Sequence, residues 1–137
     1  MPLRPDLLAA YRKALYVVHG APELVIRIGK QSDELDALLE ADGLDTAAYL
    51  TAANPGGELQ SKTENELACA ALHQALADAG YICYVGEGRD PAGDWPAEPS
   101  ILALGISRHE AQVIGRSYEQ NAIVFIERGK APELVVL

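Results

Sequence analysis

Apolar residues in this chain follow two different spacings, and the changes between them divide the sequence into helices and strands. Helical spacing predicts four helices, over residues 5–13, 32–43, 61–80 and 107–120. Short runs rich in β-branched and aromatic residues, bounded by Gly, Pro or Asn, predict strands. Seven such strands are expected, over residues 14–20, 23–29, 47–53, 81–86, 100–106, 121–129 and 131–137.

The order of these elements indicates the fold class. Strands alternate with helices in only part of the chain, so hairpins and crossover connections should coexist. The first two strands, for example, are joined by a short turn at residues 19–22 (HGAP). We therefore expect an α+β fold, a single-domain mixed β-sheet with about three packed helices (an α/β sandwich) that spans residues 1–137.

Composition and charge exclude several classes of protein. The 137 residues are 49% hydrophobic and 23% charged, which is typical of a globular domain rather than a disordered chain. The acidic net charge of −9 argues against nonspecific binding to nucleic acid or to an anionic membrane. Apolar runs are too short to span a bilayer and no signal-peptide pattern occurs, so we expect a cytoplasmic protein.

The stretch GGELQSKT, residues 56–63, differs from a phosphate-binding P-loop only at Ser61, where the motif has glycine. However, Glu58 would place a negative charge where phosphate should lie. Ser61 and Glu64 also fit a capping box, in which each side chain accepts from the other residue's backbone N–H. The same spacing recurs at Ser107 and Glu110, which favours capping. A looser anion site at this helix start is the remaining alternative.

Cysteines and histidines give little support for metal or redox chemistry. Cys69 and Cys83 lie in apolar segments and no C-x-x-C or paired-histidine spacing occurs, so we expect buried thiols, no metal site and no cofactor.

Three polar stretches are candidates for function because they end strands or form loops. They are Thr51 to Asn54, the apparent long loop from Gly86 to Ser100, and Gln120-Asn121. The loop holds the single tryptophan, Trp95. In each case a purely structural role, as a turn, a surface loop or a helix cap, is the alternative interpretation.

Several short motifs, taken in order, resemble a small bacterial family of unknown function. They are Tyr11-Arg12, TAANP (51–55), Glu64-Asn65, Gly86-x-Gly88, Trp95-x-x-Glu98, GIS (105–107) and QNA (120–122). The resemblance covers about residues 10 to 135. It departs from the family pattern at Gly56-Gly57 and Pro99-Ser100, where the pattern has a serine and a further acid or serine. The family has no established activity, so the resemblance implies a compact domain without assigning chemistry.

Three functions remain open at this point, and the sequence does not decide whether the protein is an enzyme. The first is a binding module for a small polar or anionic ligand. The second is a homodimer formed through the C-terminal strand at 131–137. The third is a hydrolase or transferase that uses Asn54 and Glu98. The ligand-binding residues expected are Arg12, Thr51, Asn54, Arg89, Trp95, Glu98, Gln120 and Asn121.

Overall fold

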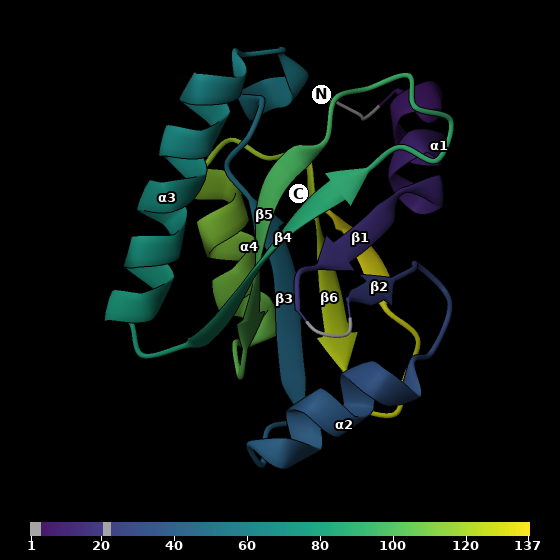
Figure 1. Ribbon diagram of the computed structural model, residues 1–137, viewed down its shortest axis with the longest axis vertical. Helices are drawn as coiled ribbons and strands as arrows, with labels where there is room; N and C mark the ends of the chain where they lie inside the picture. The colour runs from purple at the N-terminus through teal and green to yellow at the C-terminus, as the bar shows by residue number, and fades with distance from the viewer. Residues whose placement is uncertain (1–3, 21–22) are drawn as a thin grey trace.

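The computed structural model describes residues 4–20 and 23–137. Within these residues the chain forms seven strands, all in one sheet, and four α-helices (Figure 1). The helices are α1 (Pro5–Lys13), α2 (Asp33–Ala41), α3 (Lys62–Asp78) and α4 (Arg108–Ser117), with a short 3-10 turn, η1, at Pro55–Gly57. The strands are β1 (Leu15–Val18), β2 (Leu24–Ile26), β3 (Thr46–Thr51), β4 (Ile82–Arg89), β5 (Glu98–Leu104), β6 (Ala122–Glu127) and β7 (Glu133–Val136).

The predicted helices and strands all occur, and the α+β class is confirmed. The bounds of α1 agree with the prediction at both ends. The hairpin of β1 and β2 is antiparallel as expected, although residues 21 and 22 of its turn lie outside the described part of the chain. The helix starts are confirmed too: Ser61 and Glu64 form the full capping box, and Ser107 accepts from the Glu110 backbone N–H.

The sheet is antiparallel at every pairing between these strands, so the prediction of a mixed sheet was wrong. Its strand order is β2-β1-β4-β5-β3-β6-β7. The connections β3-α3-β4 and β5-α4-β6 each join strands that run in the same direction. In both, a strand of opposite direction lies between the joined pair, β5 in the first and β3 in the second. Each crossover helix therefore joins two parallel strands that are not adjacent in the sheet.

The long loop predicted for residues 87–99 is also shorter than expected. Strand β4 continues to Arg89 and β5 begins at Glu98, because the ladder extends through the pairs Glu87↔Pro99 and Gly88↔Glu98. Local composition hid this extension, since Gly and Pro weaken a strand signal. Two predicted site residues, Arg89 and Glu98, thus occupy strand ends instead of a loop.

Helices cover both faces of the sheet. On one face, α3 and α4 bury an apolar cluster that includes Leu72, Leu76 and Ala111 against Ile101 and Phe125. On α3, Cys69 is buried as expected, together with Leu72 and Leu76, whereas Leu67 is exposed and the polar Asn65 is buried. In an alanine-rich helix the apolar stripe is weakly defined, so tertiary packing selects the buried side.

The opposite face is shared by α1 and α2, which Figure 1 places at opposite ends of the sheet. Helix α2 inserts Leu35 and Leu39 into a second apolar cluster, against Ile26, Leu102 and Ile126. Helix α1 contributes no fully buried residue.

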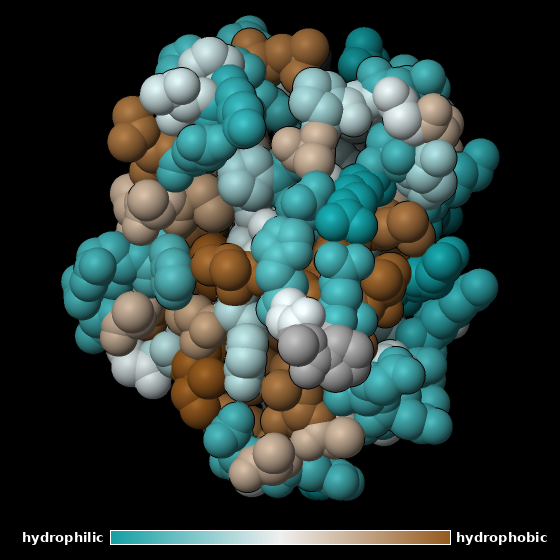
Figure 2. Space-filling view, in the orientation of Figure 1, coloured by the Kyte–Doolittle hydropathy of each residue, from teal (hydrophilic) through white to brown (hydrophobic). Residues whose placement is uncertain are grey.

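Among the described residues, the large exposed apolar side chains are distributed over several elements and loops; they are Leu59, Leu67, Ile82, Val85, Trp95, Val113 and Val136. Figure 2 shows apolar surface over the central strands between α3 and α2, surrounded by hydrophilic surface. No helix in the part of the chain that the structure describes has the length and apolar content to cross a bilayer. Strand β7 lies at one edge of the sheet, as predicted, and the homodimer expected through it stays a prediction.

Candidate functional site

A cavity of about 120 Å³ lies between α1 and the sheet, at the end that α2 does not cover. On the sheet face that α1 and α2 cover, the residues of β3 and β5 change from apolar to polar toward this end. Along β5, alternate residues on one face read Leu104, Leu102, Ser100 and Glu98, and on β3 Tyr49 is followed by Thr51. Since alternate residues of a strand share a face, an apolar floor becomes a polar one within a few residues.

Seven of the eight predicted site residues line this cavity, although they come from three separate stretches of the chain. The seven are Thr51, Asn54, Arg89, Trp95, Glu98, Gln120 and Asn121. Arg12, the eighth, is exposed on α1 and is not part of the lining. Side chains that the sequence did not single out as site residues also contribute, chiefly Tyr11, Tyr16 and Tyr49.

Asn54 and Glu98 form the polar centre of the site. The Asn54 Nδ2 donates to Glu98 Oε2 at 2.6 Å. Within residues 4–20 and 23–137, no group donates to the second carboxylate oxygen, Oε1. Because no fully buried polar side-chain atom among these residues lacks a partner, Oε1 keeps some solvent-accessible surface. Glu98 therefore offers one oxygen to whatever occupies the cavity.

Asn54 is held by contacts on both sides of its strained backbone. Its φ of 46° is in the left-handed region, which asparagine tolerates better than most residues. Asn65, buried on α3, accepts from the Asn54 backbone N–H through Oδ1 and donates from Nδ2 to Asn54 Oδ1, both at 2.9 Å. The Gln60 backbone N–H donates to the same Asn54 Oδ1. These contacts fix the amide that Asn54 presents to Glu98.

The sequence did not predict that Asn65 contributes to the site by holding Asn54. It occurs beside Glu64 in the motif series, but an asparagine within a helix gives no sign that its side chain is buried. Such an observation requires the packed structure, because only α3 docking next to the Asn54 turn brings the two amides together.

Burial controls the ionisation of the groups around the cavity. Desolvation raises the pKa of Glu98, and the hydrogen bond from Asn54 opposes this effect. Desolvation also raises the pKa of Tyr11 and Tyr16, and in both the charge of Glu98 contributes to the increase. The phenols therefore remain neutral, and their hydroxyl groups lie within the electrostatic influence of Glu98.

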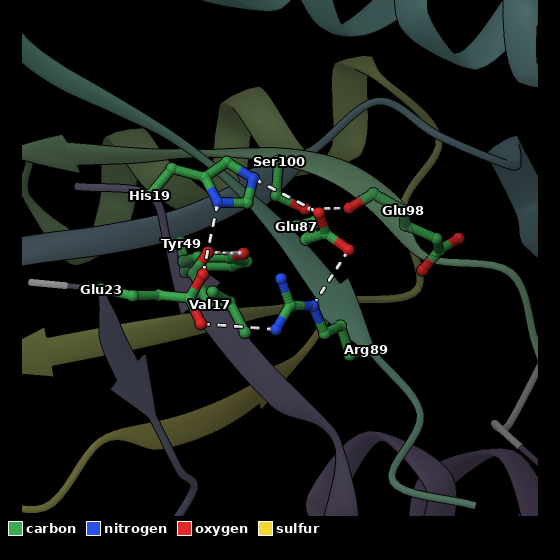
Figure 3. Close-up of polar contacts among 8 residues, drawn as sticks. All are labelled: Val17, His19, Glu23, Tyr49, Glu87, Arg89, Glu98 and Ser100. Atoms are coloured by element: carbon green, nitrogen blue, oxygen red, sulfur yellow. Dashed lines mark hydrogen bonds and ion pairs between the residues drawn. The ribbon is translucent and has the colours of Figure 1, made fainter. Parts of the chain in front are cut away.

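Arg89 lines the cavity but its guanidinium is paired elsewhere. It donates to Glu87 from Nε at 3.1 Å and to Glu23 from Nη1 at 3.4 Å, and these contacts raise its pKa. His19 approaches the same two carboxylates, with Nε2 at 3.3 Å from Glu87 Oε1. Figure 3 shows this ion-pair cluster, with the carboxylate of Glu98 directed away from it. Glu98 is thus separate from the cluster that occupies Arg89.

The cavity opens through an apolar rim. Leu59, 78% exposed, and Trp95, 43% exposed, lie there with Pro96 and Leu7. Two further surface hollows adjoin the cavity, and both share Leu59 and Pro96 with it. A compound could therefore extend from the polar interior past the rim to the surface.

The arrangement gives no support for a metal centre. Among the described residues, histidine, cysteine, aspartate and glutamate side chains form no group of three or more placed to hold a metal ion. Burial raises the pKa of the Cys69 thiol to about 11, which leaves it protonated and a poor nucleophile.

Comparisons with known proteins agree with the sequence on family but assign no activity. No curated protein and no solved structure matches this chain. The match to a family model covers residues 50–123, which include the end of β3, then α3, β4, β5 and α4, and most of the predicted site. The chain belongs to the family described as Protein of unknown function (DUF3293).

Proposed function

We propose that this protein is a binding module that encloses one small polar molecule in the cavity between α1 and the sheet. The observation that carries the proposal is the position of Glu98, a largely buried residue of the cavity lining whose second carboxylate oxygen has no protein donor and keeps some accessible surface. A buried carboxylate without a full set of donors is costly, so a ligand that supplies a donor would bind there with a gain in free energy.

The motifs TAANP, Trp95-x-x-Glu98 and QNA support this assignment. They are far apart in the sequence, yet each contributes side chains to the lining of the same cavity. We propose that these motifs define the site, with Thr51 and Gln120 shaping it and Glu98 contacting the ligand. Thr51 donates to the Pro99 carbonyl at 2.7 Å, and Gln120 donates to the Ala53 carbonyl at 3.0 Å, so both link neighbouring segments.

Blocking the cavity tests this function. Ala10 lines the cavity on α1, whereas its neighbour Ala9 is exposed. A library of small polar compounds should contain some that shift the indole N–H resonance of Trp95 and raise the melting temperature of the wild-type protein. Ala10→Phe should abolish both responses, and the matched control Ala9→Phe should retain them. Binding that persists in Ala10→Phe, or a library without a single responding compound, would contradict the proposal.

A further inference from the structure

We propose that the ligand of this cavity is a compact primary amine, bound as its ammonium ion by Glu98. This inference rests on the proposed function, since it names the chemical class of the molecule that the cavity takes. It follows from which hydrogen-bonding groups remain free inside the cavity, from the aromatic rings around it and from its size.

Four of the five hydroxyl groups that line the cavity direct their protons into the protein; the exception is Tyr11, whose hydroxyl accepts from Asn121. Tyr16 donates to the Tyr11 carbonyl at 2.5 Å, and Tyr49 donates to the Val17 carbonyl at 2.8 Å. Thr51 donates to the Pro99 carbonyl, and Ser100 donates to the Glu98 carbonyl at 3.0 Å. Their oxygens consequently remain available only as acceptors.

The amide and guanidinium donors are committed in the same way. Gln120 Nε2 donates to the carbonyls of Ala53 and Tyr118, so a ligand meets only its oxygen. Asn121 Nδ2 donates to the Tyr11 hydroxyl at 3.3 Å, and Arg89 is paired with Glu87 and Glu23. The cavity therefore offers mainly acceptors around a carboxylate, which suits a ligand rich in donors. An anion, the other class considered from the sequence, would face Glu98 without a free cationic partner.

The aromatic lining also favours a cation. Tyr16 and Tyr49 meet edge to face with ring centroids 5.3 Å apart, and Tyr11 and Trp95 complete the aromatic part of the wall. Aromatic faces attract ammonium groups, most strongly where water is excluded. A primary ammonium has three N–H donors, enough to contact Glu98 Oε1 and neighbouring acceptor oxygens together.

The volume limits the rest of the molecule. A dry cavity of about 150 Å³ holds benzene, so the 120 Å³ here accommodates about five or six non-hydrogen atoms. The apolar rim of Leu7, Leu59, Trp95 and Pro96 would contact a short hydrocarbon group. Any longer part of a natural ligand would continue past the rim into the adjoining hollows.

Three probes of similar size and different charge test the assignment: n-butylamine, 1-butanol and butyrate. Each is titrated into the full chain at neutral pH, with the Trp95 indole resonance and calorimetry as readouts. Because the ammonium adds an ion pair to the hydrogen bond that either probe can donate to Glu98, the amine should bind about tenfold more tightly than the alcohol. Butyrate should bind more weakly than the alcohol. The amine's affinity should fall as the pH drops and Glu98 becomes protonated, while the alcohol's affinity stays constant.

Two variants separate the role of Glu98 from general acidity. Glu98→Gln should remove the preference for the amine and keep binding of the alcohol, whereas Glu87→Gln, which changes a carboxylate of the ion-pair cluster, should keep the preference. Equal or tighter binding of 1-butanol or butyrate would overturn the amine assignment and leave the binding function standing. The assignment would also be overturned if none of the probes bound while library compounds did. If no compound of any charge reached Trp95, the proposed function itself would fail.

Discussion

The two ends of one sheet face differ in how completely they are packed. Helix α2 buries Leu35 and Leu39 against an apolar floor, whereas α1, also nine residues long, buries none of its residues fully and covers a polar cavity. The floor explains the difference. Leu102 and Leu104 lie beneath α2, while Ser100 and Glu98 lie beneath α1 on the same strand. The α2 end of the face thus stabilises the fold, whereas the α1 end contains a cavity and an incompletely paired carboxylate.

Core truncation should have its largest effect at the α2 end. Leu39 is 0% exposed, so Leu39→Ala should lower the free energy of unfolding by about 2–5 kcal/mol through lost burial and a new cavity. Leu7→Ala at the α1 end should cost about 1 kcal/mol or less, because Leu7 is only half-buried. Urea unfolding of both variants measures the contrast. Equal losses would show that the two ends are packed alike.

A smaller effect is expected where β4 passes close to the cavity. A Cβ at Gly86 would lie 1.9 Å from the Val17 carbonyl oxygen and 3.1 Å from the Tyr49 hydroxyl oxygen. Gly86→Ala should therefore destabilise the protein by about 1–3 kcal/mol through overpacking. A Cβ at Gly88, two residues along, would meet no atom within 4 Å, so Gly88→Ala is the matched control. Similar thermal unfolding of the two variants would refute the steric explanation.

The smallest effect should be a gain in stability at Glu98. Since burial raises its pKa, the folded protein binds this proton more tightly than the unfolded chain, and folding is penalised where Glu98 is ionised. Glu98→Gln should therefore have the higher free energy of unfolding above the folded-state pKa. This advantage should shrink as the pH falls from the folded-state pKa toward the ordinary value of 4.5, and it should be absent below that value.

Urea unfolding of wild type and Glu98→Gln across this pH range measures the effect. Glu87→Gln should show no such gain, because Glu87 pairs with Arg89 and His19. A variant less stable than wild type at neutral pH would indicate that the carboxylate stabilises the ligand-free fold. A residue that costs stability is the expected signature of a functional site, where stability and activity compete.

Much of the local structure was predictable, because it depends on neighbours along the chain. The capping box at Ser61, the N-cap at Ser107 and the seven strands follow from spacing and residue type, and so does the stop of α2 before Gly43, which has a φ of 66°. Arg89 and Glu98 were selected as site residues even though their segment was expected to be a loop. Asn65 and the buried tyrosines were not selected, since the pattern of apolar residues gives no reason to bury an amide or to orient a phenol.

By itself, the sequence determined the elements, the α+β class and a set of polar residues at strand ends. Only the tertiary structure decided that β5 lies between β3 and β4, which makes the sheet antiparallel throughout. It also decided that polar residues from distant segments surround one cavity and that four of its five hydroxyl groups donate their protons within the protein. Spacing records which residues share a face of one element, whereas strand order and hydrogen-bond partners depend on contacts between residues far apart in the chain.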